Sequence, residues 1–126
     1  MELPIEIKAN DVISIIRDIF DSDTWEPHKT EKAVADGITI RCEVALQPLV
    51  ASIDSQAFLQ IALVVGKDVL LPITVTILSN YLYDKLKERS AKSIKIGDTY
   101  ITQINVQQIY QTIIIEASRE KDKIDN

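Results

Sequence analysis

Cysteine and histidine are almost absent from this chain, and their scarcity excludes several kinds of site. Cys42 is the only cysteine and His28 the only histidine among 126 residues. One thiol cannot form a disulfide within the chain, and a zinc site needs several nitrogen or sulfur ligands at recognisable spacing. We therefore expect neither a metal site nor a cofactor. A lone thiol, behind an amino terminus without a signal-peptide pattern, predicts a cytoplasmic protein.

Glycine is also scarce, and an excess of positive charge is missing. The three glycines, Gly37, Gly66 and Gly97, are isolated from one another, which excludes a glycine-rich phosphate-binding loop. The chain has 14 basic and 19 acidic residues, a net charge of −5, whereas a nucleic-acid surface needs a basic patch. These balances favour a protein partner over a nucleic acid. That partner would be a second copy of the chain or a basic heterologous protein.

No apolar run is long enough to cross a membrane without interruption. The densest one, residues 57–86, reads AFLQIALVVGKDVLLPITVTILSNYLYDKL and is broken by the charged pair Lys67-Asp68. Charged residues at bilayer depth are costly, and a spanning helix needs roughly 20 apolar residues. The break favours a soluble core or a subunit interface, with membrane anchoring through residues 57–82 as the alternative.

Within this run the spacing predicts two helical segments, at about 55–65 and 69–89. The second is apolar nearly all round over its first three turns, a pattern typical of a helix buried in a core or an oligomer interface. One stripe along it is formed at alternating four- and three-residue steps by Leu71, Val75, Leu78 and Leu82. We take these four residues as candidates for a self-association interface.

Alternating apolar and polar residues predict strands elsewhere. Leu3, Ile5 and Ile7 alternate with polar residues in an amino-terminal strand. Pro4 cannot donate to a ladder, so this strand would either lie at a sheet edge or begin just after Pro4. Residues 38–46 alternate without a break, with Cys42, Val44 and Leu46 on the apolar side. Residues 32–35 fit either a partner strand across the Asp36-Gly37 turn or the end of a short helix.

The Gly97-Asp98 dipeptide predicts a two-residue hairpin loop within residues 92–104. This loop would pair Ile96 with Thr99 and Ile94 with Ile101 on one face, and Lys95 with Tyr100 on the other. Tyr100 would then point outward.

Two amphipathic helices complete the expected architecture, one capped by Asn10 or Asp11 and one starting at Asn105. Strands and helices do not alternate strictly, so we predict an α+β fold. A small mixed or antiparallel sheet would pack on the long central apolar helix and on the terminal amphipathic helices. Residues 1–118 would form one domain, and residues 119–126 a charged, flexible tail.

The residues that could carry chemistry form no recognisable catalytic motif. An enzyme would have to combine Cys42 and His28 with the carboxylates of Asp21, Asp23, Glu26 or Glu31. Cys42 instead fits a small core residue, since it lies on the apolar side of its strand. Trp25 is an isolated aromatic in a polar loop, which fits either an anchor of a protein interface or a lid over the edge of the core.

The sequence therefore favours a non-enzymatic, self-associating protein–protein interaction module. An acidic inhibitor, an immunity protein or an antitoxin-like partner would have this character. The candidate interface residues are Trp25, His28, Leu71, Val75, Leu78, Leu82 and Tyr100. A membrane-associated accessory protein and a small enzyme that uses Cys42 and His28 are the alternatives.

Overall fold

A computed structural model describes residues 1–21, 30–35, 37–46, 57–66, 72–87, 91–101 and 103–125. In these ranges the chain forms six strands and three helices. In chain order they are β1 (Glu2–Ala9), α1 (Val12–Phe20), β2 (Glu31–Ala35), β3 (Ile38–Leu46), β4 (Ala57–Val65), α2 (Pro72–Leu86), β5 (Ala91–Ile96), β6 (Thr99–Ile101) and α3 (Val106–Asp125).

The strands make one antiparallel sheet in the order β2-β3-β4-β1-β5-β6. The three longest strands, β3, β4 and β1, lie side by side in it. Helices and an antiparallel sheet segregate into two layers, which is the predicted α+β class.

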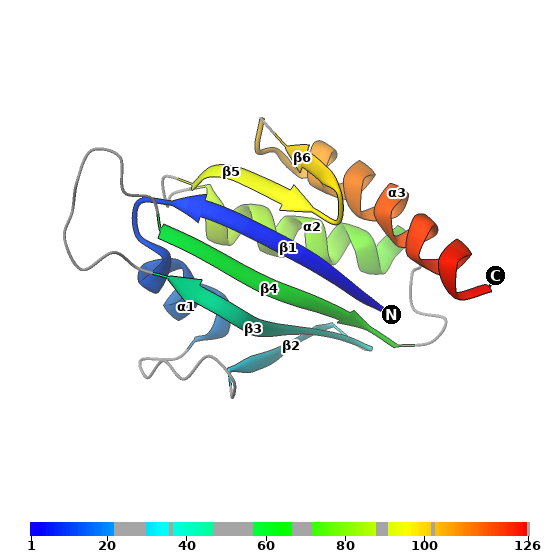
Figure 1. The fold of residues 1–126 in the computed structure, drawn as a ribbon, viewed down its shortest axis with the longest axis horizontal. Coiled ribbons are helices and arrows are strands. Elements are labelled where there is room, and N and C mark those ends of the chain that lie inside the picture. Colours follow the sequence, from blue (N-terminus) through cyan, green and yellow to red (C-terminus); the bar gives the residue numbers. More distant parts are fainter. Residues whose placement is uncertain are drawn as a thin grey trace.

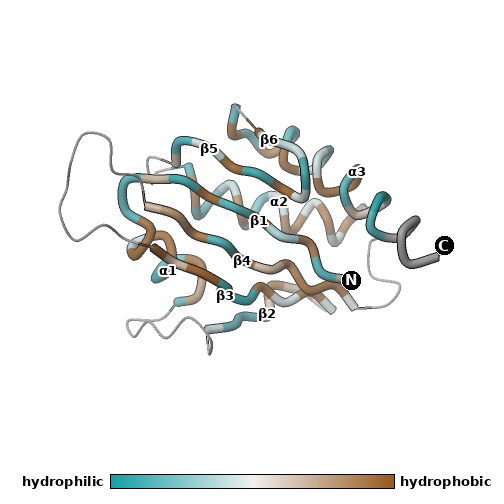
Figure 2. Tube along the Cα trace, viewed as in Figure 1, coloured by the Kyte–Doolittle hydropathy of each residue, from teal (hydrophilic) through white to brown (hydrophobic). Residues whose placement is uncertain are grey.

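All three helices pack on the same face of the sheet. In Figure 1 they lie behind it, with α1 against β3 and β4, and α3 against β1, β5 and β6. The core between the layers is built from the helix-facing side chains of the strands, such as Ile5, Ile61 and Ile94, which are at most 1% exposed. The alternation of apolar and polar residues along β1 and β5 is visible in Figure 2.

The predicted helix over residues 55–65 is wrong, because this segment contains strand β4. A short continuous apolar run fits a buried strand as well as a buried helix, and periodicity alone cannot separate the two. Here β4 pairs with β1 on one side and with β3 on the other, so its backbone is enclosed by the sheet. Alanine at positions 57 and 62 lets neighbouring groups close over the strand on both faces, and both residues are at most 5% exposed.

The expectation that Pro4 places β1 at an edge is also wrong. Strand β1 is paired on both sides, but its ladder with β5 begins only at Ile5. In an antiparallel strand the N–H and C=O of one residue point to the same side. The carbonyl of Pro4 accepts a hydrogen bond from the N–H of Gly97, just past the end of β5, at 2.8 Å. The side of Pro4 that lacks an N–H donor therefore faces the turn beyond the end of β5, so no hydrogen bond of the β1–β5 ladder is lost.

Helix α2 is buried on one side rather than all round. It contacts α1, α3 and β2, and Val75, Leu78 and Leu82 are buried. Ile73 and Ile77, one turn apart on the outward side, are 74% and 49% exposed. The helix spans 15 residues, and no helix in the described ranges is long and apolar enough to cross a membrane.

Strand β3 contains a bulge that the alternating pattern does not reveal. Cys42 pairs with Ile61, and Val44 pairs with Gln60, the neighbour of Ile61 on β4. Glu43 lies between Cys42 and Val44 and is therefore an extra residue with no partner on β4. Beyond the bulge the two faces of β3 are exchanged relative to the regular pattern. The prediction that Val44 and Leu46 share the apolar side with Cys42 is therefore wrong, because the extra residue turns both onto the opposite face.

The β5–β6 hairpin has the register that the Gly97-Asp98 loop predicts. Ile94 pairs with Ile101, Lys95 with Tyr100, and Ile96 with Thr99. Gly97 has a φ of 58°, as a two-residue turn of this kind requires at its first position. Residues 31–35 are strand β2, paired with β3, which decides between the two alternatives left open for residues 32–35.

Both amphipathic helices begin at the expected side chains. Asp11 accepts from the N–H groups of Ile13 and Ser14 at 3.1 and 3.2 Å, and Asn105 accepts from that of Gln108 at 2.8 Å. Glu116 does not face water as its position on α3 suggests, since it is only 3% exposed. The helical backbone of α3 continues to Asp125, through most of the segment predicted to be a flexible tail.

Candidate functional site

The sheet face opposite the helices is covered by none of the described elements, and we call it the open face. The ladder register assigns its side chains. They are Glu31 and Ala33 on β2; Thr39, Arg41, Glu43, Val44 and Leu46 on β3; Phe58, Gln60, Ala62 and Val64 on β4; Glu2, Pro4, Glu6 and Lys8 on β1; Ser93 and Lys95 on β5; and Tyr100 on β6.

One corner of the open face is apolar. Leu46 pairs with Phe58, and Val44 precedes them by one row, opposite Gln60. Leu46 is 61% exposed and Val44 is 37% exposed, while Phe58 is half-buried between its neighbours. Large apolar side chains gathered on an uncovered sheet face are typical of a protein-contact surface.

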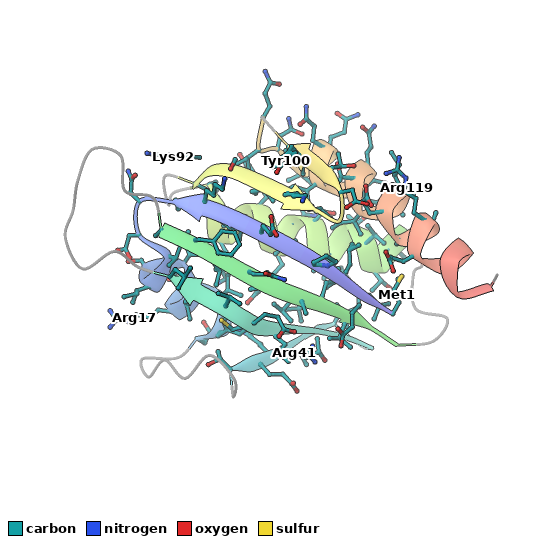
Figure 3. All side chains as sticks on the ribbon, in the orientation of Figure 1. Met1, Arg17, Arg41, Lys92, Tyr100 and Arg119 are labelled. Atoms are coloured by element: carbon teal, nitrogen blue, oxygen red, sulfur yellow. The ribbon has the colours of Figure 1, made fainter. Side chains whose placement is uncertain are left out.

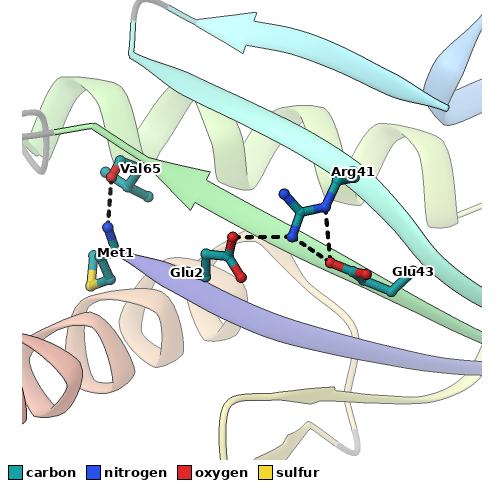
Figure 4. Close-up of polar contacts among 5 residues, drawn as sticks. All are labelled: Met1, Glu2, Arg41, Glu43 and Val65. Atoms are coloured by element: carbon teal, nitrogen blue, oxygen red, sulfur yellow. Dashed lines mark hydrogen bonds and ion pairs between the residues drawn. The ribbon is translucent and has the colours of Figure 1, made fainter. Parts of the chain in front are cut away.

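An ion-pair network crosses the open face next to this corner (Figure 4). The Nη2 of Arg41 donates to Glu43 at 2.6 Å and to Glu2 at 3.0 Å, and its Nε donates to Glu43 at 2.9 Å. Hydrogen bonds to Glu43 and then to Glu2 raise the pKa of Arg41 above its usual value. The network joins β3 to β1 across β4.

Tyr100 lies on the opposite side of the open face from Arg41, on the short edge strand β6 (Figure 3). It is 62% exposed, and the ammonium group of Lys95 lies 5.3 Å from its ring centroid. The prediction that Tyr100 points outward is therefore confirmed. Its ring and the cation above it form a second, amphipathic contact point on the same face.

The other candidate interface residues lie elsewhere. Val75, Leu78 and Leu82 are at most 2% exposed and belong to the core of the single chain, because the sheet and the neighbouring helices cover this side of α2. They present no surface to a partner. Trp25, His28 and Leu71 lie outside the described residues, so their roles stay predictions.

The residues proposed for an enzyme are not brought together within the described part of the chain. Cys42 is buried, 1% exposed, on the helix side of β3. Glu31 points to the open face beside Arg41, on the other side of the sheet. Asp23 and Glu26 fall outside the described ranges. Among the described side chains, no group of three His, Cys, Asp or Glu residues could hold a metal ion.

Asp21 instead takes part in a cluster that ties α1 to β2 and α2. It forms an ion pair with Lys32. The hydrogen bond between the two side chains lowers the pKa of Asp21 and raises the pKa of Lys32 from their usual values. The ammonium groups of Lys32 and Lys85 lie 5.6 and 5.4 Å from the ring centroid of Tyr81. The Tyr81 hydroxyl donates to the carbonyl of Ile19, and burial raises its pKa. These contacts join α1, β2 and α2 to one another, so we assign the cluster a role in the stability of the fold.

Sequence reasoning missed the apolar corner of the open face. Val44 and Leu46 follow the regular alternation of β3 and were therefore assigned to the core, and Phe58 lay in the segment assigned to a helix. Glu43 stands at a regular polar position of the alternation, so the sequence carries no local signal of the bulge. The bulge becomes visible only when the pairing with β4 is known.

The architecture defines a class of protein: a two-layer α+β domain with the three described helices on one face of an antiparallel sheet and no described element on the other face. No protein family model matches the chain, and no curated protein or solved structure gives a significant match. The open face must therefore be interpreted from its own chemistry.

Proposed function

We propose that this protein is a non-enzymatic protein–protein interaction module and that the open face is its contact surface. The observation that carries the proposal is the apolar corner of Val44, Leu46 and Phe58. An apolar side chain such as Leu46, exposed to 61% on an uncovered sheet, gains free energy when a partner removes it from water.

The surroundings of the corner fit a protein interface. Binding energy is concentrated in a few central anchors, with a polar rim around them that excludes water. The Arg41 network and the Lys95–Tyr100 pair supply such polar groups on the same face. Arginine and tyrosine are the residue types that most often anchor protein contacts.

The proposal extends to how such a module would act. A stoichiometric partner of inhibitor, immunity or antitoxin type works by covering a surface, and it needs no chemistry of its own. We place it in a reducing cytoplasm, since the one thiol of the chain is buried at Cys42.

The test compares two glutamate substitutions at exposed apolar positions on opposite sides of the molecule. Leu46→Glu changes the open face, and Ile73→Glu changes the outward side of α2, where the side chain is 74% exposed. Both should leave the circular dichroism spectrum and the urea midpoint nearly unchanged, because neither side chain is in the core.

Immobilised wild-type and variant proteins would be compared for the proteins they retain, this chain itself included. We expect Leu46→Glu to lose a partner that wild type and Ile73→Glu keep. If the wild type, Leu46→Glu and Ile73→Glu retain the same proteins in the same amounts, the open face is not the contact surface.

A further inference from the structure

We infer that the open face binds the open face of a second copy of this chain, in a two-fold dimer with the strands of the two sheets antiparallel. The inference rests on the proposed function, because it names the partner of the same surface. It differs from the interface that the helix stripe of Val75, Leu78 and Leu82 predicts, since that stripe is buried within one chain.

The balance of charge on the open face argues for a copy rather than for a strongly charged partner. The register places Glu2, Glu6 and Glu31 there, and its pair with Arg41 places Glu43 there as well. These four acids stand against three bases, Lys8, Arg41 and Lys95, a balance of −1. The whole chain carries −5. The acidic surplus that would attract a basic partner therefore lies mostly away from this face, and two copies meeting through it repel each other least.

The charges along β1 are ordered so that the strand is complementary to the same strand of a second chain running in the opposite direction. Open-face positions on this strand run Glu2, Pro4, Glu6, Lys8, with Glu2 and Lys8 both exposed. A two-fold axis that lies between the two sheets, perpendicular to the strands and level with the point between Pro4 and Glu6, places Glu2 of each chain opposite Lys8 of the other. Two symmetric attractions result from one strand, as an isologous interface requires, and Glu2 would make them with the carboxylate that also accepts from Arg41 of its own chain.

The same axis matches the apolar groups of the neighbouring strand. Phe58 on β4 shares a row with Lys8, and Val64 shares a row with Glu2. Reversal therefore places Phe58 of one chain opposite Val64 of the other. Leu46, in the row of Phe58, comes opposite Thr39, in the row of Val64. Antiparallel alignment within about 30° is also the usual arrangement for two sheets packed face to face.

A stable dimer would have to use nearly the whole open face. Strands β3, β4, β1 and β5, spaced at roughly 4.8 Å and up to roughly 27 Å long, project a flat area of about 500 Å², and side-chain relief adds to that projection. A standard interface buries about 800 Å² on each partner, so the dimer that we infer leaves no large part of the face outside the contact.

The experiment is a charge exchange read by light scattering on a sizing column and by sedimentation equilibrium, without detergent. Wild type should be a dimer that dissociates on dilution. Glu2→Lys and Lys8→Glu should each raise the dissociation constant about tenfold, because each replaces two symmetric attractions with two repulsions. The double variant, Glu2→Lys with Lys8→Glu, should recover most of the loss. Ile73→Glu should dimerise like wild type.

Each result separates this inference from the proposed function. A wild-type chain that stays monomeric overturns the second copy as partner, and the proposed function survives if Leu46→Glu still loses a different protein. A dimer that neither single exchange weakens, or one that the double variant fails to recover, shows that the copies meet in another way. If the chain is monomeric and Leu46→Glu loses no protein, both proposals fail.

Discussion

Asp11 caps the amino terminus of α1, and its carboxylate accepts three hydrogen bonds from residues close in sequence. Its Oδ1 accepts from the backbone of Ile13 and Ser14, and its Oδ2 accepts from the Ser14 hydroxyl at 2.6 Å. The Ser14 hydroxyl, helped by the two backbone N–H groups and opposed by partial burial, holds the pKa of Asp11 below its usual 3.8. A carboxyl group with a depressed pKa stabilises the fold above the unfolded-state pKa, and this stabilisation is lost as the pH falls through the folded-state pKa.

Substitution of Asp11 should therefore show both the cap and its titration. Asp11→Ala should lower the free energy of unfolding by about 1 kcal/mol at neutral pH, since it removes the cap. Asp11→Asn keeps a cap acceptor without a titrating group, so it should lose little at neutral pH. Urea unfolding at neutral pH and below pH 3.8 measures the difference. Wild type and Asp11→Asn should diverge in their acid dependence, and identical pH profiles would contradict the role of the Asp11 charge.

At Gly97 an added side chain would meet both backbone strain and a steric clash. Its φ is 58°, and an added Cβ would come closer than 3.0 Å to side-chain atoms of Glu116. That carboxylate is buried and held by the Thr99 hydroxyl at 2.5 Å and by Arg119 at 3.1 Å, so it cannot move away freely.

We expect Gly97→Ala to destabilise the protein by about 1–3 kcal/mol, measured by urea unfolding. Gly97→Asn serves as the matched variant, because asparagine tolerates positive φ but still carries a Cβ. It should remain clearly less stable than wild type. Full stability of Gly97→Asn would mean that the contact with Glu116 contributes nothing.

At the scale of elements, the bulge in β3 decides which side chains reach the open face. Without Glu43, Cys42 would still pair with Ile61, and Val44 would follow it in a regular ladder opposite Gln60. Removal of the extra residue therefore preserves every inward and outward direction. Removal of a residue from a regular part of the strand exchanges the faces of everything on one side of it.

Deletion of Glu43 should accordingly leave the protein folded, with a change in unfolding free energy of about 1 kcal/mol or less beyond the loss of its pair with Arg41. Deletion of Thr39, which pairs regularly with Val64, should prevent stable folding. Circular dichroism and thermal unfolding of the two variants compare them directly. A folded Thr39 deletion together with an unfolded Glu43 deletion would show that the register is wrong.

At the scale of the whole molecule, the helices and the sheet enclose one continuous core. Cys42 lies inside it at 1% exposure, on a strand that is paired on both sides by β2 and β4. A residue in this position becomes accessible only when the sheet opens, and such opening costs a large part of the global stability.

A thiol reagent should therefore modify Cys42 about a thousandfold or more slowly than an unfolded thiol, and added urea should accelerate the reaction in step with global unfolding. The control is Ser118→Cys combined with Cys42→Ala, because position 118 is on the exposed side of α3. That variant should react at once. Rapid modification of Cys42 in the folded wild type would contradict the core assignment and would return the thiol to consideration as a reactive group.

Local patterns in the sequence determined much of this architecture. The period of two in β1, the glycine-first loop of the β5–β6 hairpin and the caps at Asp11 and Asn105 depend on residues within a few positions of one another. Steric preferences and local hydrogen bonds act over the same range. The α+β class follows from these elements, and so does the outward direction of Tyr100.

Only the tertiary structure decided the rest. Residues 57–65 became a strand because β1 and β3 enclose them, and the stripe of Val75, Leu78 and Leu82 became core because the sheet and the other helices cover it. The bulge at Glu43 exists only relative to β4, so the apolar corner of Val44, Leu46 and Phe58 could not be located beforehand. The physical reason is the same in each case: burial and strand register are relations between segments far apart in the chain, and no local preference specifies them.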